Sequence, residues 1–565
     1  MNLSSKNNLL EVFFEQYAKQ NKDDLFLKWL KFPSKKFSWK ETNLSICKLS
    51  IEIKKNIKKG DRCLLISEDR PEWLISDLAI MLAGGITVPA YTTYTEKDYE
   101  FIIDDCQPSI LVVSSNDLFK KIKYISLNKQ FINKIIIFDD VDKNKLEHKI
   151  IKLKDILNSK ENFFVETTKL KLNRKDIACI IYTSGTGGNP KGVMLSHGGI
   201  LSNCEGAVEM LKPILSKRTN FLTWLPLSHS YEHTVQFVQI SIGAKIYYAE
   251  GIDKLIKNMS ESKPEIMTAV PRFYQNLYQK INNTFKKQSG FKLKLINLTI
   301  KLGIKDLEKQ KFTFNEKVIN KICDFLVRKK IKNQFGGNLK AFVSGGAALD
   351  KDIGNFLNSI GLPTLQGYGL TEASPVVSCN PKSYIKVDTV GIPFKGNQIK
   401  INEDGEILIK GENVMLGYWG QPEATNEVIK NDWLYTGDIG EISEGYLKIT
   451  DRKKDIIVTT GGDNISPAKI ENKISSSSEI EQCLVYGDKK SYLVALIVPI
   501  KETTKEKIDI ILAEINKSLS LIEKIKKFEL INENFTIENG LLTPTMKVKR
   551  NKVIKKYKNT LENLY

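Results

Sequence analysis

One stretch of the chain, Tyr182 to His197, combines residue types that could bind a polyphosphate, and it reads YTSGTGGNPKGVMLSH. Glycines let backbone N–H groups approach oxygen anions, hydroxyl side chains add further donors, and a lysine adds positive charge. A solvated turn rich in glycine and serine is the alternative interpretation. The candidate phosphate ligands are Thr183, Ser184, Gly185, Thr186, Gly187, Gly188 and Lys191.

A second stretch, residues 367–372, reads GYGLTE and could complete a nucleotide site. Such a site needs a flat surface for the base, a hydroxyl near the α-phosphate and a carboxylate for Mg²⁺, which takes oxygen ligands together with substrate phosphates. Tyr368, Thr371 and Glu372 supply these three groups. Taken alone, the same residues could instead begin a helix, with Thr371 near its cap.

The elements around the first stretch favour phosphate binding. The apolar run from Ile177 to Ile181 predicts a buried strand before the loop, and a helix capped by Ser196 is predicted after it. The loop is not a Walker A sequence, because Lys191 is followed by Gly192 rather than Ser or Thr, and it is not a dinucleotide fingerprint.

Strand-like and helical patterns alternate as far as Asp451, which predicts an α/β architecture with largely parallel sheets. Residues 279–338 are rich in lysine and carry apolar residues at helical spacing, which predicts two or three helices over the core. They could form a solvated hairpin or a basic amphipathic contact with a membrane. Beyond Asp451, short strands and Lys/Glu-rich helices indicate a small separate domain.

Length and composition describe a globular protein with more than one core: 565 residues, 41% hydrophobic and 27% charged. The N-terminus predicts an amphipathic helix rather than a signal peptide, and no run approaches the roughly 20 apolar residues of a membrane span. We therefore expect a cytoplasmic protein. The eight cysteines form no C-x-x-C pair, which argues against a zinc site or a disulfide framework.

The formal charge of +19 has several interpretations. It could serve nucleic acid, an anionic membrane surface, or acidic substrates such as ATP and CoA. The predominance of Lys, with many Ile and Asn residues, also fits a genome-wide coding bias. No RNP-type aromatic motif or zippered basic helix is present, so we expect no nucleic-acid partner.

The glycine-rich stretch resembles the phosphate-loop signature of the acyl-adenylate-forming superfamily, which includes acyl-CoA synthetases, adenylation domains and beetle luciferases. Gly187 departs from it, because the family usually has a second Thr there. Residues 367–372 are similar to the family's YGLTE segment, 344–348 (SGGAA) to its adenine segment, and 435–438 (YTGD) to its ribose-binding TGD. The motifs follow one another in family order.

The resemblance implies roles for particular residues. Glu372 would hold Mg²⁺, Asp438 and Arg452 would lie at the ribose, and His229 would lie at the acyl carboxylate and gate its pocket. Lys547 would contact the α-phosphate and the acyl oxygen. Lys454 would be the hinge between domains 1–451 and 452–565, and Gly461 and Gly462 would let pantetheine pass. The remaining nucleotide contacts would be Gly345, Gly346, Ala347, Gln366, Gly367, Tyr368, Gly369 and Thr371.

Three segments look most like the long-chain fatty acyl-CoA synthetases: 459–467 (TTGGDNISP) with Glu471, 542–550 (LTPTMKVKR), and 225–233 (LPLSHSYEH), where His233 replaces a common Arg. The implied fold is a large N-terminal domain of two α/β sheet layers and a small β-barrel, followed by a mobile α+β domain. The implied reaction joins a long-chain fatty acid to CoA through an acyl-adenylate, using MgATP.

Two other functions stay open: ligation of a different acid, or of an acid to a carrier protein, and, ranked last, nucleotide binding without catalysis. The residues do not fix the chain length of the acid. Attachment to the inner face of the membrane and assembly as a homodimer are also open.

Overall fold

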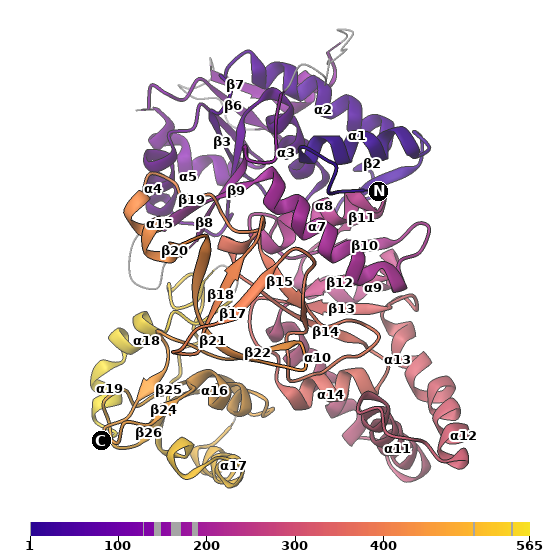
Figure 1. The fold of residues 1–565 in the computed structure, drawn as a ribbon, viewed down its shortest axis with the longest axis vertical. Coiled ribbons are helices and arrows are strands. Elements are labelled where there is room, and N and C mark those ends of the chain that lie inside the picture. The colour runs from indigo at the N-terminus through magenta and orange to yellow at the C-terminus, as the bar shows by residue number, and fades with distance from the viewer. Residues whose placement is uncertain are drawn as a thin grey trace.

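The computed structural model describes residues 2–127, 129–140, 149–159, 171–183, 190–500, 503–543 and 546–565. Two large sheets, one smaller antiparallel sheet and a separate C-terminal unit make up the chain (Figure 1). The predicted α/β architecture is confirmed, because most neighbouring strands in both large sheets are parallel.

The nine-stranded sheet runs in the order β16-β15-β14-β13-β12-β10-β11-β1-β2. Its strands alternate in sequence with helices, as expected for parallel pairing. The strands are β1 (Leu25–Trp29), β2 (Lys36–Ser38), β10 (Asn220–Thr223), β11 (Lys245–Tyr248), β12 (Ile266–Ala269), β13 (Ala341–Ser344), β14 (Thr364–Gly369), β15 (Val376–Cys379) and β16 (Ile392–Pro393).

The eight-stranded sheet runs in the order β19-β9-β8-β4-β3-β5-β6-β7 and contains the strand that leads into the glycine-rich loop. Its strands are β3 (Arg62–Ile66), β4 (Ile86–Ala90), β5 (Ile110–Val113), β6 (Lys134–Ile137), β7 (Ile150–Lys152), β8 (Ile177–Thr183), β9 (Lys191–Ser196) and β19 (Gly417–Tyr418).

Helices cover these sheets, and α3 is buried along its whole length. They are α1 (Leu9–Lys19), α2 (Trp39–Lys54), α3 (Pro71–Ala83), α4 (Glu96–Cys106), α5 (Asn116–Leu127), α6 (Leu153–Leu157), α7 (His197–Leu211), α8 (Ser230–Ser241), α9 (Leu255–Ser262), α10 (Pro271–Lys286), α11 (Gly290–Leu307), α12 (Phe314–Cys323), α13 (Lys329–Gln334), α14 (Lys351–Ser359) and α15 (Pro422–Val428).

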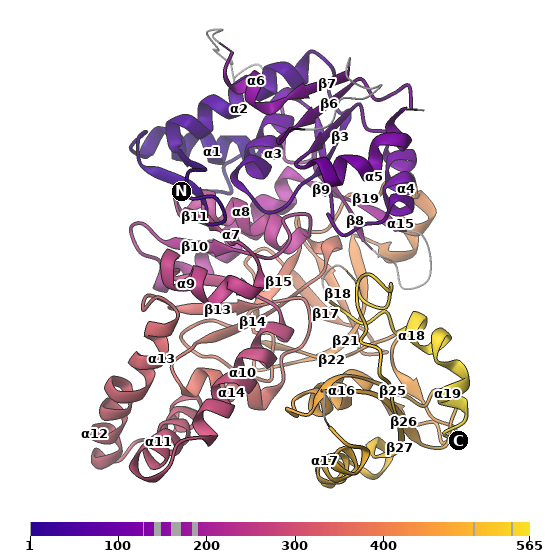
Figure 2. The same cartoon turned by 180° about the vertical axis from the view of Figure 1, so that it is seen from behind.

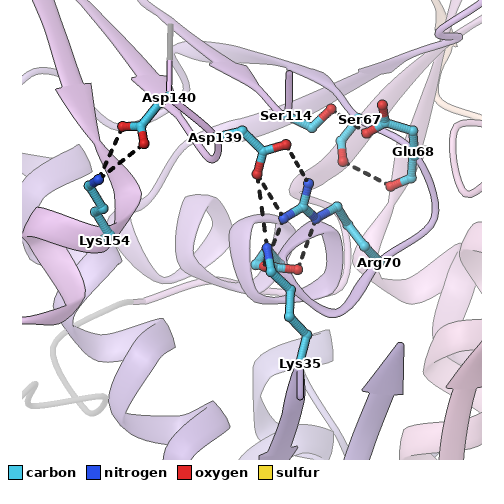
Figure 3. A network of polar contacts seen from close by, with 9 residues as sticks. Lys35, Ser67, Glu68, Arg70, Ser114, Asp139, Asp140 and Lys154 are labelled. Carbon is cyan, nitrogen blue, oxygen red and sulfur yellow. Dashed lines mark hydrogen bonds and ion pairs between the residues drawn. The ribbon is translucent and has the colours of Figure 1, made fainter. Parts of the chain in front are cut away.

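An ionic cluster with a buried Arg70–Glu72 pair at its centre joins the two large sheets (Figure 3). The Arg70 guanidinium lies 3.0 Å from Glu72 and 3.3 Å from Asp139, which follows β6. It also lies 4.5 Å from the ring of Trp29 on β1. Burial opposes ionisation of Glu72, but Arg70 and Lys35 prevail and lower its pKa. The cluster therefore fixes the β3–α3 turn between the sheets.

The part of the chain that corresponds to the small β-barrel implied by the resemblance is a five-stranded antiparallel sheet. Its strands are β17 (Gln398–Ile401), β18 (Glu406–Lys410), β20 (Ile429–Lys430), β21 (Trp433–Ser443) and β22 (Tyr446–Arg452). The C-terminal unit follows a turn at residues 453–455. It contains β23 (Ile457–Val458), β24 (Asn464–Ile465), α16 (Pro467–Ser475), β25 (Ile480–Tyr486), β26 (Leu493–Pro499), α17 (Lys505–Lys517), β27 (Ile525–Leu530), α18 (Arg550–Lys556) and α19 (Lys558–Glu562).

The helix predicted after the glycine-rich loop is confirmed as α7, but a strand, which was not predicted, comes first after the loop. This strand, β9, pairs antiparallel with β8, with Thr183 opposite Lys191. The physical reason is that the apolar residues of β9 continue the core of the sheet, where Val193 and Leu195 are fully buried. Ser196 caps α7 as predicted, since its Oγ accepts a 2.9 Å hydrogen bond from the Gly199 N–H.

All eight cysteines are free thiols buried inside the protein. Burial raises the pKa of Cys47 to about 11 and that of Cys379 to about 12. In the part of the chain that the structure describes, no helix has both the length and the apolar character needed to cross a membrane.

Candidate functional site

A cleft of about 2810 Å³ opens between the nine-stranded sheet, the five-stranded sheet and the C-terminal unit. It brings together residues predicted from motifs far apart in the sequence. Ser184 to Gly188 lie outside the described residues, and Gly461 and Gly462 do not line the cleft. The predicted residues that do line it are Thr183, Lys191, His229, Gly345, Gly346, Ala347, Gln366, Gly367, Tyr368, Gly369, Thr371, Glu372, Asp438, Arg452, Lys454 and Lys547.

The β8–β9 hairpin positions the two described ends of the glycine-rich loop. Thr183 ends β8 and Lys191 begins β9, so their backbones are paired at the base of the loop. β19 pairs with β9 and places the ring of Tyr418 4.7 Å below the Lys191 ammonium. This contact holds the lysine at the edge of the cleft through a cation–π interaction.

Tyr418 also holds the candidate metal ligand. Its hydroxyl donates a 3.0 Å hydrogen bond to Oε1 of Glu372. Among the described residues, no cluster of three or more His, Cys, Asp or Glu could hold a metal alone. Glu372 nevertheless fits Mg²⁺, because that ion is commonly bound by one or two carboxylates together with substrate phosphates.

Thr371 and His229 meet at the start of α8. The Thr371 and Ser230 hydroxyl oxygens lie 3.0 Å apart. His229 caps the helix, and its Nδ1 accepts a hydrogen bond from the Tyr231 N–H at 3.1 Å. Burial, with a smaller contribution from the Lys547 charge, lowers the pKa of His229 to about 3. The imidazole is therefore neutral, with Nε2–H left to donate to a ligand.

Tyr368 and Asp438 form the base and ribose side of the cleft. The Tyr368 hydroxyl donates a 2.6 Å hydrogen bond to Asp438 Oδ2, and Arg452 Nε lies 3.7 Å from Oδ1. Burial raises the pKa of Asp438, while Arg452 and Tyr368 oppose that shift. The Tyr368 ring and the Asp438 carboxylate are thus held in one fixed arrangement.

Two further predicted residues, Gln366 and Gly345, make contacts that hold the backbone on this side of the cleft. Gln366 accepts from the Leu349 N–H at 2.9 Å and donates to the Thr389 carbonyl at 3.2 Å, so its amide is engaged by protein. Gly345 approaches Tyr231 closely, because a Cβ there would lie 3.0 Å from the ring. These contacts fix the segment that runs along the cleft.

Lys547 reaches the cleft from the C-terminal unit. A bridge between Leu542 and Val548 closes the short turn that carries it. Its side chain stays accessible to the solvent of the cleft, yet burial of the site and the nearby Arg452 charge lower its pKa, with Asp438 opposing. The ammonium is thereby placed in the electrostatic environment of both His229 and Asp438.

Arg550 anchors the segment that follows this turn. It donates to the Glu471 carboxylate at 2.5 Å and to the Val485 carbonyl at 2.7 Å. Glu471 and Arg550, which belong to the two segments of this domain that look like the long-chain fatty acyl-CoA synthetases, therefore form one internal pair. The pair fastens the lysine-bearing segment to α16 and β25.

A latch holds the C-terminal unit against the large domain. Arg272, on α10, donates to the Glu481 carbonyl at 2.8 Å and also pairs with its carboxylate. Gln279 donates to the Ser477 carbonyl at 3.3 Å on the same face. These contacts hold the C-terminal unit in the orientation that places Lys547 in the cleft.

Sequence reasoning missed Tyr418, Ser230 and Arg272. No sequence motif predicts a role for Tyr418, which becomes apparent only from the pairing of β19 with β9. Ser230 directly follows His229, so its position next to a predicted site residue could have indicated its role. Arg272 has no motif around it, and its partner Glu481 lies 209 residues away.

His233 lies away from the cleft, in the core. Its Nε2 is 2.9 Å from Asp77 Oδ2, and both side chains are buried. Burial alone would lower its pKa, but the Asp77 charge prevails and raises the pKa to about 10. His233 is therefore a structural cation paired with Asp77 of α3. A cation at this position agrees with the Arg that is common there in the long-chain fatty acyl-CoA synthetases.

Comparison with known proteins gives matches along nearly the whole chain. Residues 14–419 match the family model described as AMP-binding enzyme, and residues 454–565 match the AMP-binding enzyme C-terminal domain. The chain is 30% identical to long-chain-fatty-acid–CoA ligase FadD15 of Mycobacterium tuberculosis, over 90% of this chain and 88% of that protein. It is 32% identical to long-chain-fatty-acid–CoA ligase 5 of Rattus norvegicus, over 89% and 79%.

Solved structures show the same fold. The anthranilate CoA ligase AuaEII in complex with anthranoyl-AMP matches with a TM-score of 0.79 at 19% identity, over 99% of both chains. ATP-bound MatB from Rhodopseudomonas palustris matches with a TM-score of 0.75 at 23% identity, over 98% of this chain and 100% of that one. The length of these matches and the family model together establish that the chain belongs to the AMP-binding enzyme family.

Proposed function

We propose that this enzyme is a long-chain fatty acid–CoA ligase that forms an acyl-adenylate from MgATP and then transfers the acyl group to CoA. The observation that carries the proposal is the convergence of Glu372, Thr371, His229, Asp438 and Lys547 on one cleft. The names of the curated relatives, long-chain-fatty-acid–CoA ligases, support the choice of acid and acceptor.

In the first half-reaction, a carboxylate oxygen attacks the α-phosphorus, and the bond from that phosphorus to pyrophosphate breaks. Both reactants are anionic, so charge neutralisation and alignment are the main tasks of the protein. Lys547 and Lys191 supply cations, and the neutral His229 donates from Nε2 to the acyl carboxylate. Mg²⁺ held at Glu372 would neutralise phosphate charge.

In the second half-reaction, the CoA thiolate attacks the acyl carbon and AMP leaves. Gly461 and Gly462 lie at the exposed tip between β23 and β24, outside the cleft. If they guide pantetheine, the domain beginning at residue 452 must rotate about Lys454 before this step. A rotation that replaces Lys547 with the glycine tip would separate the two steps and keep the adenylate from water.

The acid would lie along the apolar part of the cleft, whose lining includes Trp224, Ile252 and Phe273. Glu232 also lines it, but burial raises the pKa of this carboxyl to about 8, so it is mostly neutral at pH 7. The Thr268 hydroxyl donates to it at 2.6 Å. The lining is therefore compatible with a hydrocarbon chain, whose burial contributes up to about 0.8 kcal/mol per methylene.

Pyrophosphate release across acetate, benzoate, octanoate and palmitate tests the proposal, with CoA or a carrier protein as acceptor. We expect palmitate with CoA to be turned over fastest. Faster turnover of acetate or benzoate would reject the long-chain assignment. Product formation on a carrier protein but not on CoA would reject the acceptor.

A further inference from the structure

A helical arm, residues 290–334, projects from one end of the molecule (Figures 1 and 2). It consists of α11, α12, a π-helical segment at Asp324–Arg328 and α13. Its inner side packs on the body: a Cβ on Gly303 would lie 2.5 Å from Ser359 of α14, and Arg328 donates to the Ser359 carbonyl at 2.7 Å. The arm is thus a fixed part of the fold with one side turned outward.

The outward side of α12 and the π-helical segment is apolar. Phe314 is 81% exposed and Phe325 is 66% exposed, with Val318 and Ile322 also exposed between them. Their spacing of four, eight and eleven residues from Phe314 places them on one helical face. Phe291, at the start of α11, is 75% exposed. Large aromatic side chains rarely gather in solvent without a partner surface.

The same arm is strongly basic. Nine exposed lysines lie within residues 290–334, against three exposed acidic residues. Lys317 and Lys321 lie beside the apolar face at helical spacing from Phe314. An apolar face bordered by lysines complements an anionic lipid surface, because the rings enter the interface while the ammonium groups stay at the headgroups.

We propose that the arm docks the enzyme on an anionic lipid bilayer through the face of Phe314, Val318, Ile322 and Phe325 and the surrounding lysines. The positive charge of the arm favours a lipid bilayer over a protein partner, since a protein would need a groove that is both apolar and strongly acidic. α10 joins the two sites: its first turn lines the cleft, and its last residue, Lys286, lies roughly 24 Å away along the helix axis, next to the arm. Delivery of a membrane-dissolved acid to the cleft rests on the proposed function, whereas docking itself does not.

Co-sedimentation of the full-length enzyme with vesicles tests the proposal. Vesicles of zwitterionic lipid with 30% anionic lipid, as probe, should bind the wild type, and binding should weaken as salt rises. The double variant Lys317→Gln/Lys321→Gln should bind about 25-fold more weakly at low salt, at about fivefold per lysine. Phe314→Ser/Phe325→Ser should bind at least about tenfold more weakly at every salt concentration.

A matched control carries Lys97→Gln and Tyr124→Ser on α4 and α5, at the opposite end of the molecule (Figure 1). Tyr124 is 73% exposed, so this variant also removes one exposed ring and one surface cation. It should bind vesicles as the wild type does. All variants should retain pyrophosphate release with octanoate, a soluble substrate, which shows that they fold.

Three results would overturn docking: no binding by the wild type, equal binding to neutral and anionic vesicles, or arm variants that bind like the control. A change in sedimentation coefficient in Phe314→Ser/Phe325→Ser, with vesicle binding intact, would assign the face to a second copy and also overturn it. If no acid releases pyrophosphate while vesicle binding follows the expected pattern, the proposed function fails and docking stands.

Discussion

The two walls of the cleft are built differently. On the large-domain wall, the two candidate carboxylates are tied to other residues: Glu372 to Tyr418, and Asp438 to Tyr368. On the C-terminal wall, a short turn carries Lys547, and within the described residues its ammonium has no hydrogen-bond partner.

The large-domain wall holds its groups in place before a ligand binds, whereas the C-terminal domain can bring its cation into the cleft or remove it. Groups already aligned by hydrogen bonds need no reorganisation when charge develops on a ligand. A cation on a separate domain can instead be present in one step and absent from the next. The large-domain wall would therefore serve both half-reactions, and Lys547 would serve only one.

The largest expected effect comes from removing the delivered cation. Lys547→Ala should slow acyl-adenylate formation by about 10²–10³, because charge developing on the α-phosphate loses its counter-ion. Conversion of supplied acyl-adenylate and CoA to thioester should continue. Separate assays of pyrophosphate release and of thioester formation measure the two steps.

Lys454→Pro should have the opposite effect to Lys547→Ala. Proline fixes φ at the turn after β22 and should block rotation of the C-terminal domain. Thioester formation should fall while adenylation continues. Equal loss of both steps in both folded variants would contradict the division between the walls.

Removal of the fixed carboxylate should be nearly as costly. Glu372→Gln should slow adenylation by about 10², because an amide is a poor Mg²⁺ ligand. Raising the Mg²⁺ concentration should recover part of the rate, which a purely structural defect would not permit. An unchanged Mg²⁺ dependence would remove Glu372 from the metal site.

Breaking the latch between the walls should have an intermediate effect. Arg272→Ala should slow adenylation about tenfold, because a charge-assisted hydrogen bond to Glu481 no longer holds Lys547 in the cleft. Thioester formation from supplied adenylate should not slow. Lys280→Ala, an exposed position on the same helix, serves as control and should behave as wild type.

Loosening the fixed wall should matter less. Tyr418→Phe removes the hydroxyl that orients Glu372 but keeps the ring below Lys191. One neutral-donor hydrogen bond to a carboxylate is involved, so adenylation should fall about fivefold. The apparent Mg²⁺ affinity should weaken in parallel, and an unaltered affinity would show that Tyr418 does not act through Glu372.

The smallest effect concerns pH. Because the pKa of Lys547 is lowered, its charge is lost earlier than that of an ordinary lysine as pH rises. Adenylation should therefore decline on the alkaline side, and Lys547→Arg should move that decline upward. Thioester formation should lack this limb, so a shared limb would assign it to another group.

The sequence predicted the parts whose signals are local. Alternating strands and helices, Ser196 as a cap, and the residues of the cleft motifs could be read within short windows. The role of Tyr418 could not, since it depends on the pairing of β19 with β9. Ser184 to Gly188 lie outside the described residues, so their phosphate contacts stay predictions.

The histidines of one motif show the same limit. His229 and His233 are four residues apart, yet the pKa is about 3 for the first and about 10 for the second. The difference comes from Asp77, which lies 156 residues before His233 in the sequence. Such a partner is set by the packing of α3 against α8, and no window around the motif contains it.

Because every cysteine is buried, chemical modification of the thiols can report on unfolding of this protein. Thiolates react with oxidants and alkylating reagents, and here burial limits access to the thiols and raises the pKa of Cys47 and of Cys379. Modification of a thiol therefore requires the surrounding segment to open first. Cys483 lies in the C-terminal unit and the other seven lie in the large domain. The order in which thiols become labelled during heating would therefore reveal which unit loosens first.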